Sequence, residues 1–130
     1  MKLLDTNVCI AFLNGTDDGV RARLVAEDPD SVVLCSVVKA ELLYGARHSE
    51  HVDRNLSRLA SFFAPFESLP FNDGAAEIYG LVRAQLRRAG RPIGGNDLII
   101  AATALASDAT LVTRNQDEFR RVPGLRVEAW

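Results

Sequence analysis

The chain has 130 residues, of which 48% are hydrophobic and 25% charged, with a formal net charge of −2 at pH 7. These values are ordinary for a folded globular protein and exclude an intrinsically disordered chain. No apolar run approaches the roughly 18 residues of a membrane helix, because charged residues or glycine interrupt every stretch. The first segment, MKLLDTNVCIAFLNG, lacks the basic region and long apolar core of a signal peptide, so we expect a cytoplasmic protein without a membrane partner.

Short apolar runs alternate with helix-like periodicity along the chain. The run SVVLC is rich in β-branched residues and predicts a strand, and the helix expected after it has Ser36 as its N-cap candidate. Gly90 is expected to end a long helix. In chain order we expect a strand at residues 2–5, helices at 6–13 and 17–27, a strand at 31–35, helices at 36–48 and 50–63, a strand at 66–69, helices at 72–89 and 96–106, a strand at 109–113, a helical turn at 117–121 and a strand at 125–129.

This alternation predicts an α/β fold with a central parallel sheet flanked by helices on both faces. Because the sequence has no internal repeat and no evident linker, we expect residues 1–130 to form one domain. In open parallel sheets, functional residues gather beyond the carboxyl ends of the strands. The ends of the predicted strands are therefore the places to search for chemistry.

Three acidic residues belong to that edge. Asp5 ends the first strand, Glu41 lies one turn into the helix after SVVLC, and Asp97 opens the helix of residues 96–106. Asp5 alone could be an N-cap, and Asp97 alone could answer the helix dipole. None of the three has a cation three or four residues away in a helix, so no local partner balances its charge. Together they would repel one another unless a cation joined them, and Mg²⁺ or Mn²⁺ prefers such oxygen ligands.

Charge is divided unevenly along the chain. Residues 1–80 carry 7 basic and 12 acidic side chains, whereas residues 81–130 carry 8 basic and 5 acidic ones. The stretch from Leu81 to Gly95 has four arginines and no acid. Such a run is either a solvated helix face or a surface for an anionic partner, because arginine matches phosphate oxygens well.

Other chemistries have little support. The only histidines, His48 and His51, lack nearby cysteines for zinc and do not lie at a predicted strand end, as a catalytic triad would require. No phosphate-cradling glycine motif is present. Cys9 and Cys35 lie in apolar runs and are most simply buried reduced thiols, with a disulfide as the alternative.

Four segments carry a family resemblance: LDTNVCI, SVVKAELLYGA, RPIGGNDLIIAATAL and LVTRNQDEFRRVPGLRVEAW. They are similar, in order and spacing, to the motifs of PIN-domain ribonucleases, and specifically to VapC toxins of bacterial toxin–antitoxin pairs. The G-x-P-I-G-x-x-D form and the ending E-F-x-R-V-P-G-L-x-V-E-x-W resemble the subgroup that cuts initiator tRNA in its anticodon loop.

The resemblance implies roles for individual residues. Asp5, Glu41 and Asp97 match the catalytic acids that hold Mg²⁺ or Mn²⁺, and Thr6 matches a hydroxyl that supports the metal site. The fourth family position, sometimes Asp, falls on Asn115, a departure that leaves a second metal site in doubt; Asp117 is close to it in sequence. The resemblance also implies a homodimer and a VapB-type antitoxin whose C-terminal segment covers the acidic cleft. The candidates for holding RNA, alongside Thr6 and Asn115, are Arg83, Arg87, Arg88, Arg91 and Arg114.

The predicted activity is metal-dependent endoribonuclease cleavage, with tRNA as the expected substrate. A water activated by Mg²⁺ needs no RNA 2′-hydroxyl as nucleophile, so the products should carry 5′-phosphate and 3′-hydroxyl ends. Two alternatives remain: a catalytically weak RNA- or protein-binding module on the same scaffold, or a phosphotransfer enzyme with Asp5 as nucleophile. Against the second, the residue two positions after Asp5 is Asn7 rather than an acid.

Overall fold

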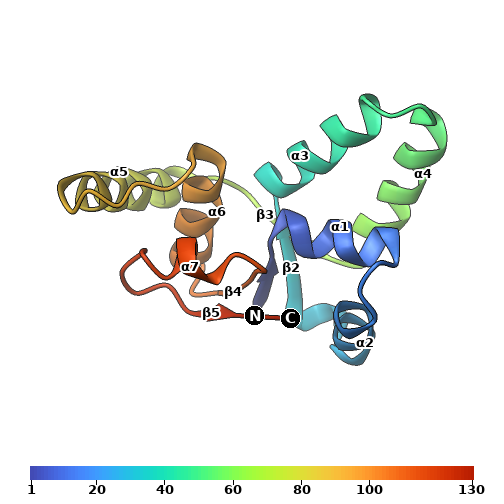
Figure 1. Ribbon diagram of the computed structural model, residues 1–130, viewed down its shortest axis with the longest axis horizontal. Helices are drawn as coiled ribbons and strands as arrows, with labels where there is room; N and C mark the ends of the chain where they lie inside the picture. Colours follow the sequence, from blue (N-terminus) through green and yellow to red (C-terminus); the bar gives the residue numbers. More distant parts are fainter.

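Five short parallel strands form the centre of the molecule, seen in a computed structural model that describes residues 1–130 (Figure 1). The sheet order is β3-β2-β1-β4-β5, so the first strand of the chain lies in the middle. Leu3 pairs with Val33 on one side and with Leu111 on the other. The strands are β1 (Lys2–Leu4), β2 (Val32–Cys35), β3 (Glu67–Leu69), β4 (Thr110–Val112) and β5 (Val127–Glu128).

Helices connect every pair of consecutive strands. They are α1 (Thr6–Asn14), α2 (Asp18–Ala26), α3 (Ser36–Arg47), α4 (Val52–Phe63), α5 (Asp73–Arg88), α6 (Gly95–Ala106) and α7 (Gln116–Phe119), with a 3-10 turn at Pro29–Ser31. The predicted alternation of strands and helices is confirmed, with boundaries that shift by one to a few residues. None of the helices has the length and apolar character needed to cross a membrane.

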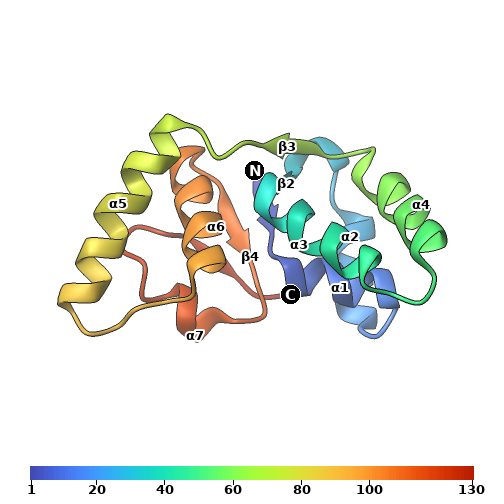
Figure 2. The ribbon, with the colours of Figure 1, turned by 90° about the horizontal axis from the view of Figure 1, so that it is seen from above.

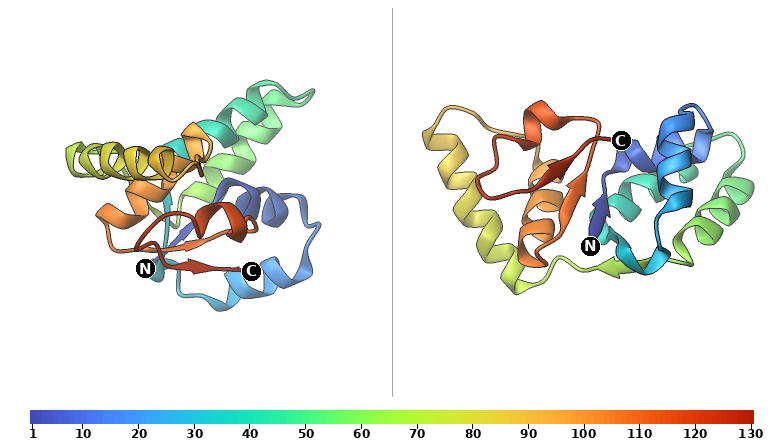
Figure 3. Two further views of the ribbon diagram at one scale, coloured as in Figure 1. Left: turned by 60° about the vertical axis from the view of Figure 1, so that its left-hand side comes forward. Right: turned by 90° about the horizontal axis from the view of Figure 1, so that it is seen from below.

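The connections run outward from β1 in two directions. The chain first moves from β1 to β2 and β3, then crosses back to β4 and continues to β5. Because crossovers between parallel strands are right-handed, this reversal places α5 and α6 on the face opposite to α1–α4. Figures 2 and 3 show α5 at one end of the molecule and α4 at the other, with the sheet between them. The predicted three-layer α/β architecture is therefore confirmed.

Apolar side chains from the sheet and from both helical layers form one core of 28 buried residues. Leu3, Leu4 and Leu111 are fully buried in the central strands, and all four residues of β2 are buried. These strands are buried on both faces, which explains why they contain continuous apolar runs rather than alternating ones. Cys9 and Cys35 are buried free thiols in this core, and burial raises the pKa of both.

Two helix ends test the local predictions. Gly90 ends α5 as expected: the C-cap is Ala89, and Gly90 follows it with a φ of 67°, which glycine adopts without strain. The N-cap prediction for Ser36 was wrong. Cys35 holds the N-cap position with an extended backbone, and Ser36 is the first, exposed residue of α3. The strand β2 thus continues directly into the helix, without a side-chain cap.

Candidate active site

The strand order reverses between β1 and β4, and ligand sites of open α/β sheets lie at such a reversal. Asp5 leaves β1 there, and the segment from Thr113 to Glu118 leaves β4 beside it. The two segments are joined directly, because the Asp5 amide donates a hydrogen bond of 2.9 Å to the Val112 carbonyl. Helix α6 begins at the same edge and brings Asp97 to it.

Asp5 is held rigidly at this edge. It is the N-cap of α1, and its Oδ1 accepts a 2.7 Å hydrogen bond from the Thr6 amide. Its Oδ2 accepts a 2.8 Å hydrogen bond from the hydroxyl of Thr113, which is fully buried. Only 4% of Asp5 is exposed, and this burial raises its pKa in spite of the two hydrogen bonds, with the carboxylates of Glu41 and Glu118 adding to the effect. Asp5 is therefore both the expected N-cap and a buried acid with a raised pKa.

Glu41 meets a hydroxyl group rather than a cation. The Thr6 side chain donates a 2.8 Å hydrogen bond to Glu41 Oε1, linking the start of α1 to the second turn of α3. Glu41 is partly buried, and it contributes to the raised pKa values of Asp5 and Asp97. The structure thus brings together Asp5, Thr6, Glu41 and Asp97, which are separated by up to 92 positions in the sequence. Their roles remain predictions.

Asp97 faces an acid that the sequence analysis missed. Its pKa is raised to about 6, first by burial and then by the carboxylates of Glu118, Asp5 and Glu41. Glu118 lies in α7, and its Oε1 accepts a 3.0 Å hydrogen bond from the Gly94 amide, three residues before Asp97. The site therefore contains four carboxylates rather than three.

Asn115, expected at the fourth acidic position, serves Glu118 instead. Its side-chain amide donates a 2.5 Å hydrogen bond to Glu118 Oε2, and its backbone amide donates to the Thr113 hydroxyl at 3.0 Å. Asp117, the other acid considered there, is exposed. One sequence signal pointed to Glu118: it occupies the third helical position after Asn115, the spacing of a capping box.

No ion pair of the structure includes Asp5, Glu41, Asp97 or Glu118. No protein cation compensates their negative charge, so nothing offsets the burial, and after it the mutual repulsion, that raise the pKa values of Asp5 and Asp97. No three of these side chains approach closely enough to form a ready-made metal cage. The donor set instead fits a hydrated Mg²⁺, which keeps several waters and needs only one or two direct carboxylate ligands.

The arginines expected to hold RNA lie in different surroundings. Arg114 forms a 3.0 Å ion pair with Asp17, the N-cap of α2, so it ties two loops together. Arg87, Arg88 and Arg91 are exposed at the end of α5 and in the loop after it, and none pairs with an acid. These three are available to a ligand, and their role as RNA contacts stays a prediction.

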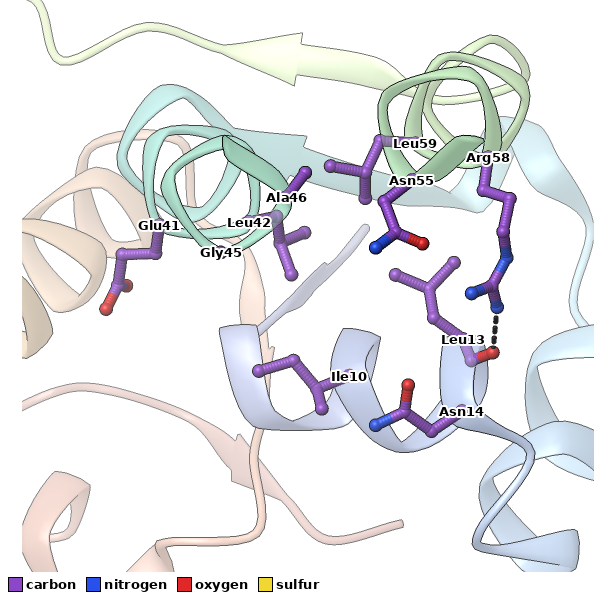
Figure 4. A pocket seen from close by; sticks show the side chains of 10 residues that line it. All are labelled: Ile10, Leu13, Asn14, Glu41, Leu42, Gly45, Ala46, Asn55, Arg58 and Leu59. Carbon is purple, nitrogen blue, oxygen red and sulfur yellow. Dashed lines mark hydrogen bonds between the residues drawn. The ribbon is translucent and has the colours of Figure 1, made fainter. Parts of the chain in front are cut away.

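A groove of about 290 Å³ leads away from Glu41 between α1, α3 and α4. Figure 4 shows Ile10 and Leu13 on one side of it, Leu42 and Leu59 on the other, and Glu41 at one end. The polar residues Asn14, Asn55 and Arg58 lie at the opposite end, where Arg58 donates to the Leu13 carbonyl. The groove therefore has largely apolar walls, and Glu41, one member of the acidic cluster, lies at one end of it.

Comparison with known proteins places this geometry in a family. The PIN domain model matches residues 2–125. Ribonuclease VapC2 of Rickettsia felis is 38% identical over 130 residues, covering 98% of this chain and 96% of the relative. The tRNA(fMet)-specific endonuclease VapC of Shigella flexneri is 38% identical over 128 residues, with the same coverage.

Solved structures agree with the sequence relatives. The chain superposes on VapBC2 from Rickettsia felis, bound to a DNA fragment from its promoter, with a TM-score of 0.90 and 37% identity, covering 99% of this chain and 98% of that one. The DNA-bound VapBC of Salmonella typhimurium gives a TM-score of 0.92 and 36% identity over 99% and 97% of the two chains. The chain therefore belongs to the PIN-domain family, and within it to the VapC ribonucleases.

Proposed function

We propose that this protein is a Mg²⁺-dependent endoribonuclease, the toxin of a toxin–antitoxin pair. The observation that carries the proposal is the cluster of Asp5, Glu41, Asp97 and Glu118, which lies at the sheet edge without a protein cation. Membership in the VapC ribonucleases supports the same conclusion. A nucleophilic Asp5 is disfavoured, because both of its carboxylate oxygens accept hydrogen bonds and the residue is almost fully buried.

Each residue of the site has a distinct task in this proposal. A bound divalent cation would neutralise charge on the phosphate oxygens and make a water a better nucleophile. Asp5 and Asp97 would hold the cation, with Glu41 and Glu118 orienting its waters. The Thr113 and Thr6 hydroxyls fix the orientations of Asp5 and Glu41. Because the pKa of Asp97 is about 6, cation binding displaces a proton below that pH, and affinity for Mg²⁺ should rise with pH up to this value.

The substrate we propose is tRNA, with initiator tRNA as the first candidate. The names of two relatives, from Shigella flexneri and Salmonella typhimurium, specify tRNA(fMet). Proteins that read RNA sequence usually target loops, where bases are unstacked, and an anticodon loop offers such bases next to a scissile phosphodiester. An acidic sheet edge that holds a cation can accept a loop more easily than a continuous duplex.

The experiment is cleavage of initiator tRNA by the purified protein, with and without Mg²⁺, and with elongator methionine tRNA for comparison. We expect a single Mg²⁺-dependent cut with 5′-phosphate and 3′-hydroxyl ends. Asp5→Asn and Glu41→Gln should lose detectable cleavage while keeping a folded circular-dichroism spectrum. Glu50→Gln, an exposed acid just after α3, is the matched control and should cleave normally. Undiminished cleavage in EDTA, or in both active-site variants, would show the proposal to be wrong.

The partner we propose is a VapB-type antitoxin. Structural neighbours of this chain are VapBC complexes, and the groove between α1, α3 and α4 offers a place for an extended segment of such a partner. Apolar side chains of the antitoxin's C-terminal segment would lie against Ile10, Leu13 and Leu42, and a cationic side chain would reach Glu41. We also propose a homodimer, for which exposed apolar residues on α3 and α5, Tyr44 and Leu81, are available surface.

A further inference from the structure

A second hollow of about 290 Å³ lies between α5, α6 and the loop that joins them. Two of its residues, Leu86 and Leu98, are almost fully buried and contribute an apolar wall. Arg83 and Arg87 also line it, one helical turn apart on α5, and both are exposed. Gly95, the first residue of α6, lines it too. The hollow therefore combines a buried apolar wall with two positively charged groups.

Neither arginine is balanced by an acidic side chain. No acid pairs with Arg83 or Arg87, and like charges four residues apart destabilise a helix slightly. The helix dipole accounts for Arg87, in the last turn of α5, because positive charge is favourable there. It does not account for Arg83, which lies more than one turn before the end of the helix.

Arg83 is nevertheless held in place. Its Nη1 donates a 2.8 Å hydrogen bond to the Tyr79 hydroxyl, and its guanidinium lies 5.8 Å from the centre of the Tyr79 ring. Tyr79 is in turn packed edge-on against Phe71, with ring centres 6.1 Å apart. A guanidinium fixed by neutral partners keeps its full positive charge and some of its donors for a ligand.

Adjacent residues at the start of α6 connect the hollow to the acidic site. Gly95 faces the hollow, and its neighbour Gly94 donates a hydrogen bond to Glu118. The two sites are thus neighbours at the start of α6, and they have opposite charge. Four carboxylates attract a cation but repel the phosphates of an RNA strand, so RNA bound at the acids needs positive charge beside them.

We propose that Arg83 and Arg87 form a subsite for a backbone phosphate of the RNA, one that flanks the phosphodiester cut at the acids. This inference rests on the proposed ribonuclease function. Guanidinium groups bind phosphate oxygens with paired, charge-assisted hydrogen bonds, and the phosphate would lie at the mouth of the hollow between them. The subsite serves binding of the substrate, so its loss should act on KM and leave kcat unchanged.

The test uses the full-length double variant Arg83→Gln/Arg87→Gln, with Arg47→Gln/Arg54→Gln, exposed arginines of α3 and α4, as the control with the same change of charge. Cleavage of the tRNA substrate is measured between about 50 and 200 mM salt. We expect the first variant to raise KM about tenfold at unchanged kcat, and to flatten the log–log salt dependence by about 0.7 for one lost phosphate contact. Arg83→Lys/Arg87→Lys keeps the charge and should restore the salt slope.

The outcomes separate the subsite from the underlying activity. If the unmodified protein does not cleave RNA with Mg²⁺, the proposed function itself fails. If it cleaves RNA and the double variant matches the control in KM and salt slope, the subsite is overturned. It is equally overturned if the variant cleaves normally but loses affinity for the antitoxin, because the hollow would then bind an acidic protein segment.

Discussion

Asp97 is the residue of the site whose ionised form the fold disfavours most clearly. In the folded protein its pKa is about 6, compared with an ordinary value of 3.8, so the fold favours its protonated form. Below about pH 4 the residue is protonated in both folded and unfolded states and makes no difference. As the pH rises towards 6, the unfolded chain ionises first and stability falls, and above that range the folded state carries the full repulsion.

We therefore expect Asp97→Asn to stabilise the metal-free protein at about pH 8 by on the order of 1 kcal/mol, with little effect near pH 4. The measurement is thermal or urea unfolding in EDTA at both pH values. Asp53→Asn is the control, because Asp53 is an exposed acid in the first turn of α4. A variant that is less stable than the unmodified protein at about pH 8 would contradict the idea that Asp97 is repelled by its neighbours.

Thr113 is a second residue whose effect can be isolated. Its buried hydroxyl donates to Asp5 and accepts from the Asn115 amide, so it serves two partners at once. Thr113→Val should reduce cleavage about 10–100-fold, the range for groups that orient metal ligands, and reduce stability by roughly 1–3 kcal/mol. Cleavage rates and urea unfolding measure the two effects. Thr113→Ser keeps the hydroxyl and should retain most activity; if Ser and Val behave alike, the hydroxyl does not orient Asp5.

At the scale of elements, the order of strands and helices was predictable because it depends on local sequence patterns. The run SVVLC and the helix of residues 96–106 needed no tertiary information, since apolar periodicity and β-branched residues specify them. The proximity of Asp5, Glu41 and Asp97 was predictable for a related reason. Asp5 follows a strand, Glu41 lies in the second turn of the helix after a strand, and Asp97 lies in the first turn of α6, so the alternation of elements places all three near the same sheet edge.

Glu118 could not be found in the same way. Helix α7 has only four residues, too few for periodicity to assign a face. The contact that defines the role of Glu118 is with Gly94, 24 positions earlier, and it exists only because the loop before α6 packs beside α7. Because neither the face of the short helix α7 nor this long-range contact can be recognised from the sequence, we expected a site with only three negative charges. Asn115 carries no charge, and this was the main argument against a second cation. The fourth carboxylate, that of Glu118, makes the net negative charge of the site larger and removes that argument.

At the scale of the whole molecule, the four acids of the site come from two different parts of the fold. Asp5 and Glu41 come from the part of the chain that forms β1–β3 and α1–α4, whereas Asp97 and Glu118 come from α6 and α7. Figure 2 shows these two groups of helices on opposite sides of the central strands. A cation held by members of both pairs would cross-link the two parts, so its binding energy would add to the stability of the fold as a whole.

We expect Mg²⁺ to raise the free energy of unfolding of the unmodified protein by about 2.7 kcal/mol when its concentration is 100 times the dissociation constant, and so to raise the unfolding midpoint. Asp97→Asn should lose most of this gain, although the variant is more stable without metal. The check is unfolding monitored over a Mg²⁺ titration at constant ionic strength, with NaCl as the control salt. Equal gains in both proteins would mean that Asp97 does not contribute to the cation site.

The central position of β1 also determines when during synthesis the active site can exist. β1 is made first, but its neighbour β4 starts only at Thr110, and Glu118 follows β4. A nascent chain that has extended past Asp97 still lacks Thr113 to hold Asp5 and lacks Glu118 opposite Asp97. The acids of the proposed nuclease therefore assemble only after the chain has left the ribosome at least as far as Glu118. A truncated fragment that ends before β4 lacks both Thr113 and Glu118, so it should have no nuclease activity even where Asp5, Glu41 and Asp97 are present.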